Sequence, residues 1–141
     1  MFGTSNLVNN NENNDTVNAL SQDLGAEVSI IPTYRFDQLK EKIKNVNFKK
    51  VQVIFMLILG NEAKYIAYHL KHKSDKYRTD LLNSFVQDTA YLIDQIPKTI
   101  TVIFCDLLIR FDKNHETGMS NPNFVRKMMN SQLKGHSKHF T

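Results

Sequence analysis

Val51-Gln-Val-Ile-Phe-Met-Leu-Ile-Leu59 is the longest apolar stretch of the chain, and a second, Ile100-Thr-Val-Ile-Phe-Cys-Asp-Leu-Leu-Ile109, follows it. Both are rich in β-branched residues and far shorter than the roughly 20 residues of a membrane-spanning helix, so they are typical of strands. A strand that is apolar at successive positions is buried on both faces, as in a parallel sheet between helices. The two stretches therefore predict central strands at 51–59 and 100–109.

Helical patterns alternate with these strands. A shorter β-rich run, Val28–Ile31, ends at Pro32, and helices are expected from about residue 15 to Gly25, over 36–46, over 76–96 and over 122–133. Strict alternation favours right-handed βαβ units. The sequence therefore predicts an α/β fold, a three-layer α/β/α sandwich with Val28–Ile31, Val51–Leu59 and Ile100–Ile109 parallel in one sheet.

Composition narrows the function classes. The chain has 141 residues, a net charge of +4 and one cysteine, Cys105, which fits a single domain without internal disulfides or a cysteine-rich zinc module. No Walker loop, dinucleotide-binding glycine pattern or calcium loop is present, so we expect no metal and no cofactor. The first residues do not form a signal peptide, and we expect an intracellular, cytoplasmic protein without a membrane segment.

Loops after the carboxyl ends of parallel strands carry function in such sheets. These loops begin at Pro32, Gly60 and Arg110, and a fourth begins at Gly3 if Met1-Phe2 is the end of a first strand. Two of them hold short motifs, Gly3-Thr-Ser-Asn6 and Gly60-Asn61. The loops that begin at Gly3, Pro32 and Gly60 would all emerge at the same edge of the sheet. We therefore expect their residues Ser5, Thr33 and Asn61 to converge there.

On this alternation of strands and helices, the two motifs resemble the SGNH (GDSL-type) hydrolase family. The segments Ile31–Leu39 and Phe104–Asp112 and the pair Asn130-x-x-Leu133 resemble further blocks of that family. The resemblance implies a serine esterase with Ser5 as nucleophile and Asn61, beside Gly60, as a donor to the oxyanion. It puts Thr33 at the position of a glycine that contributes an oxyanion-binding N–H.

The chain departs from the family at several positions. Thr4 replaces the aspartate beside the serine, and Thr33 replaces the glycine. The Asp-x-x-His block that supplies base and orienting carboxylate is not found at the end of the chain, and neither His136 nor His139 follows an aspartate by three residues. We therefore expect a single SGNH hydrolase-like domain over 1–141 that lacks a full first strand and this last block, and is catalytically impaired.

Two other interpretations stay open. A non-catalytic RNA-binding or protein-interaction module could use the same scaffold, since the resemblance extends to the RNA-binding OSK domain and to esterase-like domains of retrotransposons. A run of cations fits phosphate contacts, and it comprises Lys64, Lys71, Lys73, Lys76 and Arg78. The other interpretation is an unrelated flavodoxin-like domain. The expected partner is thus an ester substrate if the chain is active, or RNA.

Overall fold

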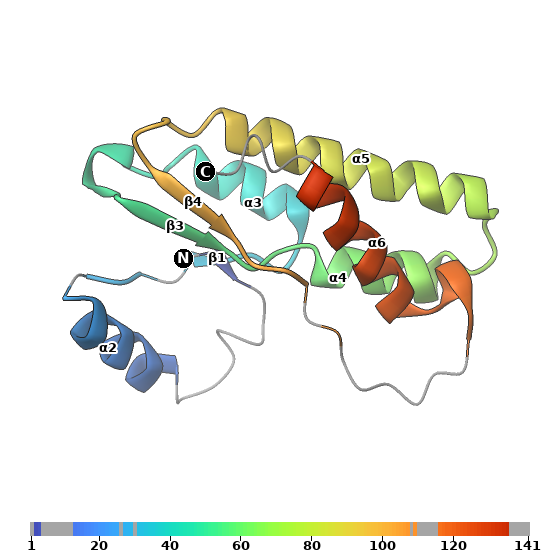
Figure 1. The fold of residues 1–141 in the computed structure, drawn as a ribbon, viewed down its shortest axis with the longest axis horizontal. Coiled ribbons are helices and arrows are strands. Elements are labelled where there is room, and N and C mark those ends of the chain that lie inside the picture. Colours follow the sequence, from blue (N-terminus) through green and yellow to red (C-terminus); the bar gives the residue numbers. More distant parts are fainter. Residues whose placement is uncertain are drawn as a thin grey trace.

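A computed structural model describes residues 2–3, 13–25, 27–29, 31–107, 109 and 116–135 of the chain (Figure 1). It is a mixed helix and strand structure with parallel strand pairing. The elements are β1 (Phe2–Gly3), α2 (Asn13–Leu24), β2 (Ile31–Pro32), α3 (Phe36–Ile43), β3 (Val53–Met56), α4 (Gly60–Lys64), a π-helical turn (Tyr65–His69), α5 (Asp75–Asp94), β4 (Thr101–Phe104) and α6 (Pro122–Gly135), with 3₁₀ turns at Phe48–Lys50 and Gly118–Ser120.

The strands pair in the order β2-β1-β3-β4, and every pair is parallel. The main ladder runs from Val53 opposite Thr101 to Met56 opposite Phe104, while β1 and β2 contribute two residues each. Strands β3 and β4 therefore lie parallel in one sheet, each within its long apolar run but shorter than it. The first predicted strand, Val28–Ile31, is wrong in its bounds, because β2 comprises Ile31–Pro32 and shares only Ile31 with it. The last residues of both long runs leave the ladder before the helices that follow.

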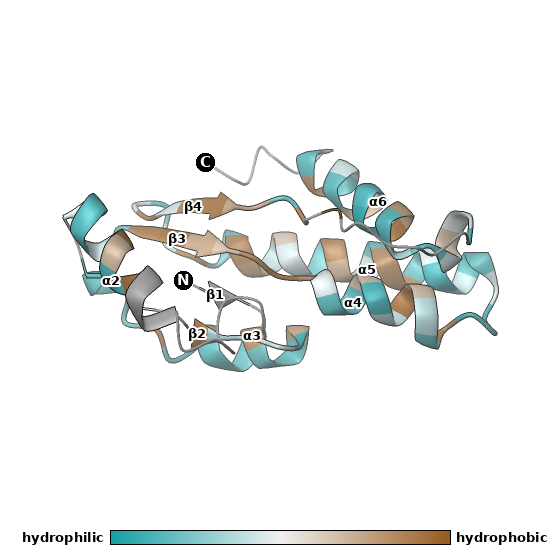
Figure 2. Cartoon of the chain, turned by 90° about the horizontal axis from the view of Figure 1, so that it is seen from below, coloured by the Kyte–Doolittle hydropathy of each residue, from teal (hydrophilic) through white to brown (hydrophobic). Residues whose placement is uncertain are grey.

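The sheet has one well-covered side. Ile54, Met56 and Val102 are buried, whereas Val53 and Ile103, which point to the other side, are 44% and 41% exposed. Helices α3 and α5 lie on the covered side, and α2 lies on the other (Figures 1 and 2). No described residue of α2 belongs to the buried core. The expectation that the long strands are buried on both faces is therefore wrong for Val53 and Ile103.

Residues 60–69 form a helical segment that the sequence did not lead us to expect. Its apolar side chains recur at helical spacing, with Ala63, Ile66 and Ala67 fully buried and Leu70 6% exposed. The segment begins at Leu59, whose φ of 72° is the only positive value outside glycine among the described residues. Burial of the Leu59 side chain, 2% exposed, offsets the strain of this left-handed conformation and turns the chain sharply from β3 into α4.

The side chain of Asn130 ties helix α6 to the chain after β4, where Lys134 also forms an exposed ion pair of 3.3 Å with Asp106. The Asn130 Oδ1 atom accepts a hydrogen bond of 2.7 Å from the Leu107 N–H, and its Nδ2 donates one of 3.1 Å to the Leu107 carbonyl. Leu133, one turn further on, is 3% exposed. The pair Asn130-x-x-Leu133 therefore anchors α6 through one polar clamp and one apolar contact. No helix in the described part of the chain is long and apolar enough to cross a membrane.

We predict that Asn130→Ala lowers the free energy of unfolding by about 2 kcal/mol, because two hydrogen bonds are lost and both backbone groups of Leu107 lose their partner. Urea denaturation measures the change. Ser131→Ala, at an exposed position of the same helix, is the control and should shift stability by less than about 0.5 kcal/mol. Equal stability of the two variants would contradict the clamp.

Candidate functional site

Two loops meet at the carboxyl edge of the sheet. The loop from β2 to α3 and the turn from β3 to α4 both leave this edge, and β1, which pairs with β2 on one side and β3 on the other, lies between them. The strand order reverses its direction at β1, which is the switch point at which open parallel sheets bind ligands. The described residues of both loops are therefore in the position where a site is expected.

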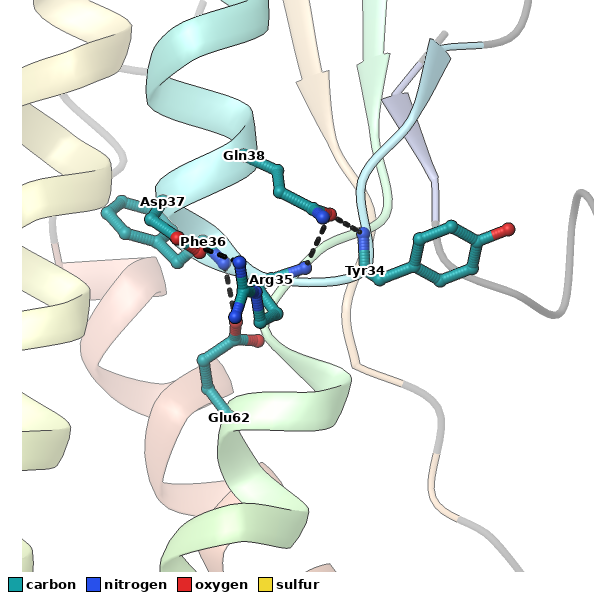
Figure 3. Close-up of polar contacts among 6 residues, drawn as sticks. All are labelled: Tyr34, Arg35, Phe36, Asp37, Gln38 and Glu62. Atoms are coloured by element: carbon teal, nitrogen blue, oxygen red, sulfur yellow. Dashed lines mark hydrogen bonds and ion pairs between the residues drawn. The ribbon is translucent and has the colours of Figure 1, made fainter.

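Two neighbouring side chains of α4 hold the first loop by its backbone. Asn61 donates a hydrogen bond of 2.6 Å from Nδ2 to the Tyr34 carbonyl. Glu62 accepts one of 2.7 Å at Oε1 from the Phe36 N–H, the first residue of α3 (Figure 3). A carboxylate at this place satisfies an N–H that has no partner within the helix and lies at the positive end of its dipole. We call these two contacts the loop clamp.

The same loop is also tied from within α3. Gln38 accepts hydrogen bonds at Oε1 from the N–H groups of Tyr34 (2.8 Å) and Arg35 (3.2 Å). Arg35 forms an exposed ion pair of 3.3 Å with Asp37. Figure 3 shows these groups gathered around the start of α3. The side chain of the third helical residue thus reaches back over the helix start, as in a capping box.

A groove of about 690 Å³ opens beside the loop clamp, between the start of α3, the α4 segment and α5. Phe36 and Phe85 meet edge to face in its lining, with ring centroids 6.1 Å apart. Lys40 lies 5.1 Å above the Phe36 ring and pairs with Asp88 at 3.3 Å. The remaining lining residues are Tyr34, Arg35, Asp37, Asn61, Glu62, Lys64, Tyr65 and His69. The groove thus combines aromatic walls with charged groups of both signs.

Burial raises the pKa of the Glu62 carboxyl above its ordinary value of 4.5, and the nearby Asp37 adds to the effect. The hydrogen bonds from backbone N–H groups, including that of Phe36, act in the opposite direction. Loss of water around the charged form outweighs these bonds. A carboxyl group with a raised pKa in a groove is typical of functional sites.

The residues that the sequence singled out have different positions. Thr33 is buried, at 3% exposure, and lies next to Tyr34. Gly60 is the first residue of α4, and a Cβ there would meet nothing within 4 Å. The positive φ of the turn belongs to Leu59, so the turn does not require a glycine at position 60. The structure thus brings the loops of Thr33 and Asn61 together. Ser5 lies outside the described residues.

The run of cations is not a uniform surface. Arg78 is buried, at 5% exposure, and donates to Ser120 at 3.1 Å and to Asp75 at 2.5 Å. Lys71 pairs with Glu116 at 3.1 Å. Arg78 therefore joins the start of α5 to the turn before α6, in contrast to the exposed position that the phosphate interpretation requires. The other members of the run, Lys64, Lys73 and Lys76, are exposed.

Histidines do not form a catalytic pair in the described part of the chain. His69 stacks on Tyr65, with centroids 5.6 Å apart, and neither it nor the exposed His72 bonds to a carboxylate. The spacing Asp-x-x-His does occur once, at Asp112 and His115, a pair that the sequence interpretation overlooked because it was sought at the end of the chain. Both residues lie outside the described ranges, as do His136 and His139.

Comparisons with known proteins give no family, since no protein-family model, no curated protein and no solved structure matches this chain. Within the described ranges, no group of three or more histidine, cysteine or acidic side chains could hold a metal ion.

Sequence reasoning missed the three groove residues Glu62, Tyr65 and His69. They follow one another at spacings of three and four residues, which puts them along one side of a helix. The signal was available in the buried residues 63, 66, 67 and 70, whose spacing is helical. The polar pair Asn61-Glu62 near the start of the segment, and His69 at its end, obscure this apolar spacing.

We predict a pH-dependent effect of Glu62→Gln. The glutamine oxygen can still accept from the Phe36 N–H, but the buried charge is gone. Because the folded-state pKa of Glu62 is raised, its contribution to stability is full below 4.5 and is lost as pH rises through the raised value. Wild type should therefore lose free energy of unfolding relative to Glu62→Gln over this window, as measured by denaturation at a series of pH values.

Glu62→Ala is the complementary variant. It removes the acceptor as well as the charge, so it should be less stable than Glu62→Gln by about 1 kcal/mol at neutral pH. Parallel pH profiles for wild type and Glu62→Gln would contradict the burial of a titrating carboxyl at this place.

Proposed function

We propose that this chain is an SGNH hydrolase-like domain that works as a binding module, with single-stranded RNA as its ligand, and has little or no esterase activity. The observation that carries the proposal is the loop clamp. The amide of Asn61, the residue that the resemblance assigns to the oxyanion, is directed to the Tyr34 carbonyl at 2.6 Å. A groove with aromatic and charged walls lies next to it.

The proposal includes a three-layer α/β/α arrangement and an intracellular location. The position of α2 on the side of the sheet opposite α3 and α5 supports a second helical layer (Figure 1). The single cysteine, Cys105, is compatible with a reducing compartment. The resemblance to SGNH hydrolases supports the architecture as a family trait.

Weak esterase activity follows from the state of the oxyanion donors. A donor stabilises a tetrahedral intermediate only if it is free and aimed at the developing charge, and loss of one such donor lowers the rate by a factor of about 100 or more. The Asn61 amide already has an acceptor. Thr33, in place of glycine, is buried beside the same loop. Neither His69 nor His72 pairs with a carboxylate as a general base does in a triad.

We predict that hydrolysis of a short-chain nitrophenyl ester by wild type equals that by Ser5→Ala. The assay includes His115→Ala as a second variant, since His115 is preceded by Asp112 at the family's spacing. Turnover that is lost in both variants would contradict the proposal and would identify Ser5 and His115 as a catalytic pair. The readout is the hydrolysis rate at saturating ester after the buffer background is subtracted, and it should be the same for wild type and both variants.

RNA is proposed as ligand because exposed lysines and exposed aromatic residues occur together between α4 and the start of α5. Lys64, Lys73 and Lys76 are exposed, and the residues Tyr65 and Tyr77 are 47% and 49% exposed. Lys73 lies 5.2 Å above the ring of Tyr77. Cations that contact phosphates, together with rings on which bases stack, are the means by which proteins bind single strands.

We predict that replacing Lys64, Lys73 and Lys76 with glutamate weakens binding of a uridine-rich oligonucleotide and flattens its salt dependence. Each lost phosphate contact lowers the slope of log K against log salt by about 0.7, so the triple variant should lose about 2. Fluorescence anisotropy at several salt concentrations measures this slope. Replacing Lys49 and Lys50 with glutamate is the control, because both are exposed residues before β3, away from the proposed surface. An equal loss of affinity and of salt dependence per replaced lysine in this control would refute a localised RNA surface.

A further inference from the structure

The Glu62 carboxylate has unused capacity that faces the groove. Oε1 accepts from the Phe36 N–H at 2.7 Å. The carboxylate also accepts from its own backbone N–H, and these two bonds use only part of the acceptor capacity of its two oxygens. Each carboxylate oxygen can accept two hydrogen bonds. A ligand edge with two adjacent N–H groups would therefore fit both oxygens and would restore to Glu62 the hydrogen bonds that burial removed.

The walls of the groove suit a planar ring. Tyr65 stacks on His69 with an interplanar angle of 25°, and both residues lie on the same side of the helical segment as Glu62. Phe36 and Phe85 supply further ring surface. The volume of about 690 Å³ falls in the range of small-molecule sites. A base that stacks against these rings would have its edge within the groove that Glu62 lines.

The ion pairs of the groove leave one cation and one carboxylate, Lys64 and Glu62, for a ligand. Arg35, Lys40 and Lys64 all line the groove. Two of its three carboxylates already have partners, Asp37 with Arg35 and Asp88 with Lys40, both at 3.3 Å. Lys64 has no ion-pair partner among the described residues and is exposed at the rim. The ligand should therefore combine a neutral N–H edge with a negative group, and a nucleotide has both.

We propose that the groove selects a guanine base of the bound RNA, with Glu62 accepting from the base and Lys64 contacting its phosphate. Guanine is the only one of the four RNA bases whose Watson–Crick edge carries two adjacent donors, N1–H and N2–H₂. Adenine and cytosine present a donor beside an acceptor, and the acceptors of uracil would face the carboxylate. This inference rests on the proposed function and gives that function a sequence preference.

The test uses a uridine-rich oligonucleotide with a single guanosine, inosine or adenosine at one position. Inosine keeps N1–H and lacks the N2 amino group. Wild type should bind the guanosine oligonucleotide about tenfold more tightly than the adenosine one, with inosine between them, as expected for one bidentate contact. In Glu62→Gln the side-chain amide meets the donors of guanine with donors of its own, so the preference should vanish. Glu41→Gln, at an exposed position of α3, should keep it.

The outcomes separate this inference from the proposed function. Equal, salt-dependent binding of all three oligonucleotides by wild type would overturn the guanine site and leave RNA binding standing. No binding of any oligonucleotide, together with binding of guanosine monophosphate that is lost in Glu62→Gln, would overturn RNA binding and support the guanine site. Guanosine preference that persists in a folded Glu62→Gln, checked by its amide NMR spectrum, would overturn the role of Glu62.

Discussion

The hydrogen bonds from Asn61 to the Tyr34 carbonyl and from the Phe36 N–H to Glu62 join the two halves of the sheet's carboxyl edge. Two adjacent residues of α4 thereby fix the backbone at the start of α3. The start of α3 forms one wall of the groove, and the α4 segment forms another. These two bonds occupy the amide of Asn61 and hold the Glu62 carboxyl in a partly buried position. The loop clamp thus removes a proposed oxyanion donor and places a carboxylate on the groove.

The loop clamp depends in turn on the turn at Leu59. The left-handed residue Leu59, which comes three residues after the last residue of β3, is followed at once by α4, and positions 61 and 62 thereby lie next to the loop after β2. The π-helical turn that follows keeps Tyr65 and His69 on the groove. Strained backbone and π-helical turns are both enriched at functional sites, since their cost is retained only where a geometry is needed. Here both lie in the segment that carries the proposed base contact.

Much of the fold could be predicted from the spacing of apolar residues, because spacing reports which faces are buried. The strands within 51–59 and 100–109 and the helices α3, α5 and α6 follow from it. The open side of Val53 and Ile103 could not, since apolar character does not say whether a second layer covers it. The partners of Asn61 and Glu62 are set by tertiary contacts across more than twenty residues of chain. The Gly60-Asn61 motif predicted that Asn61 lies at the carboxyl edge of the sheet. It also predicted an Asn61 amide that is free to bind an oxyanion, whereas in the structure this amide donates to the Tyr34 carbonyl.

The amide proton of Phe36 gives the most direct measurement of the loop clamp. Its NMR chemical shift, followed over pH, should change with the ionisation of Glu62, because a carboxylate accepts a stronger hydrogen bond from this N–H than a neutral acid does. We predict an inflection above the ordinary carboxyl pKa of 4.5 in wild type and no inflection in Glu62→Gln. An amide shift that is independent of pH in wild type, or an inflection that persists in Glu62→Gln, would contradict the contact on which the groove and its proposed ligand depend.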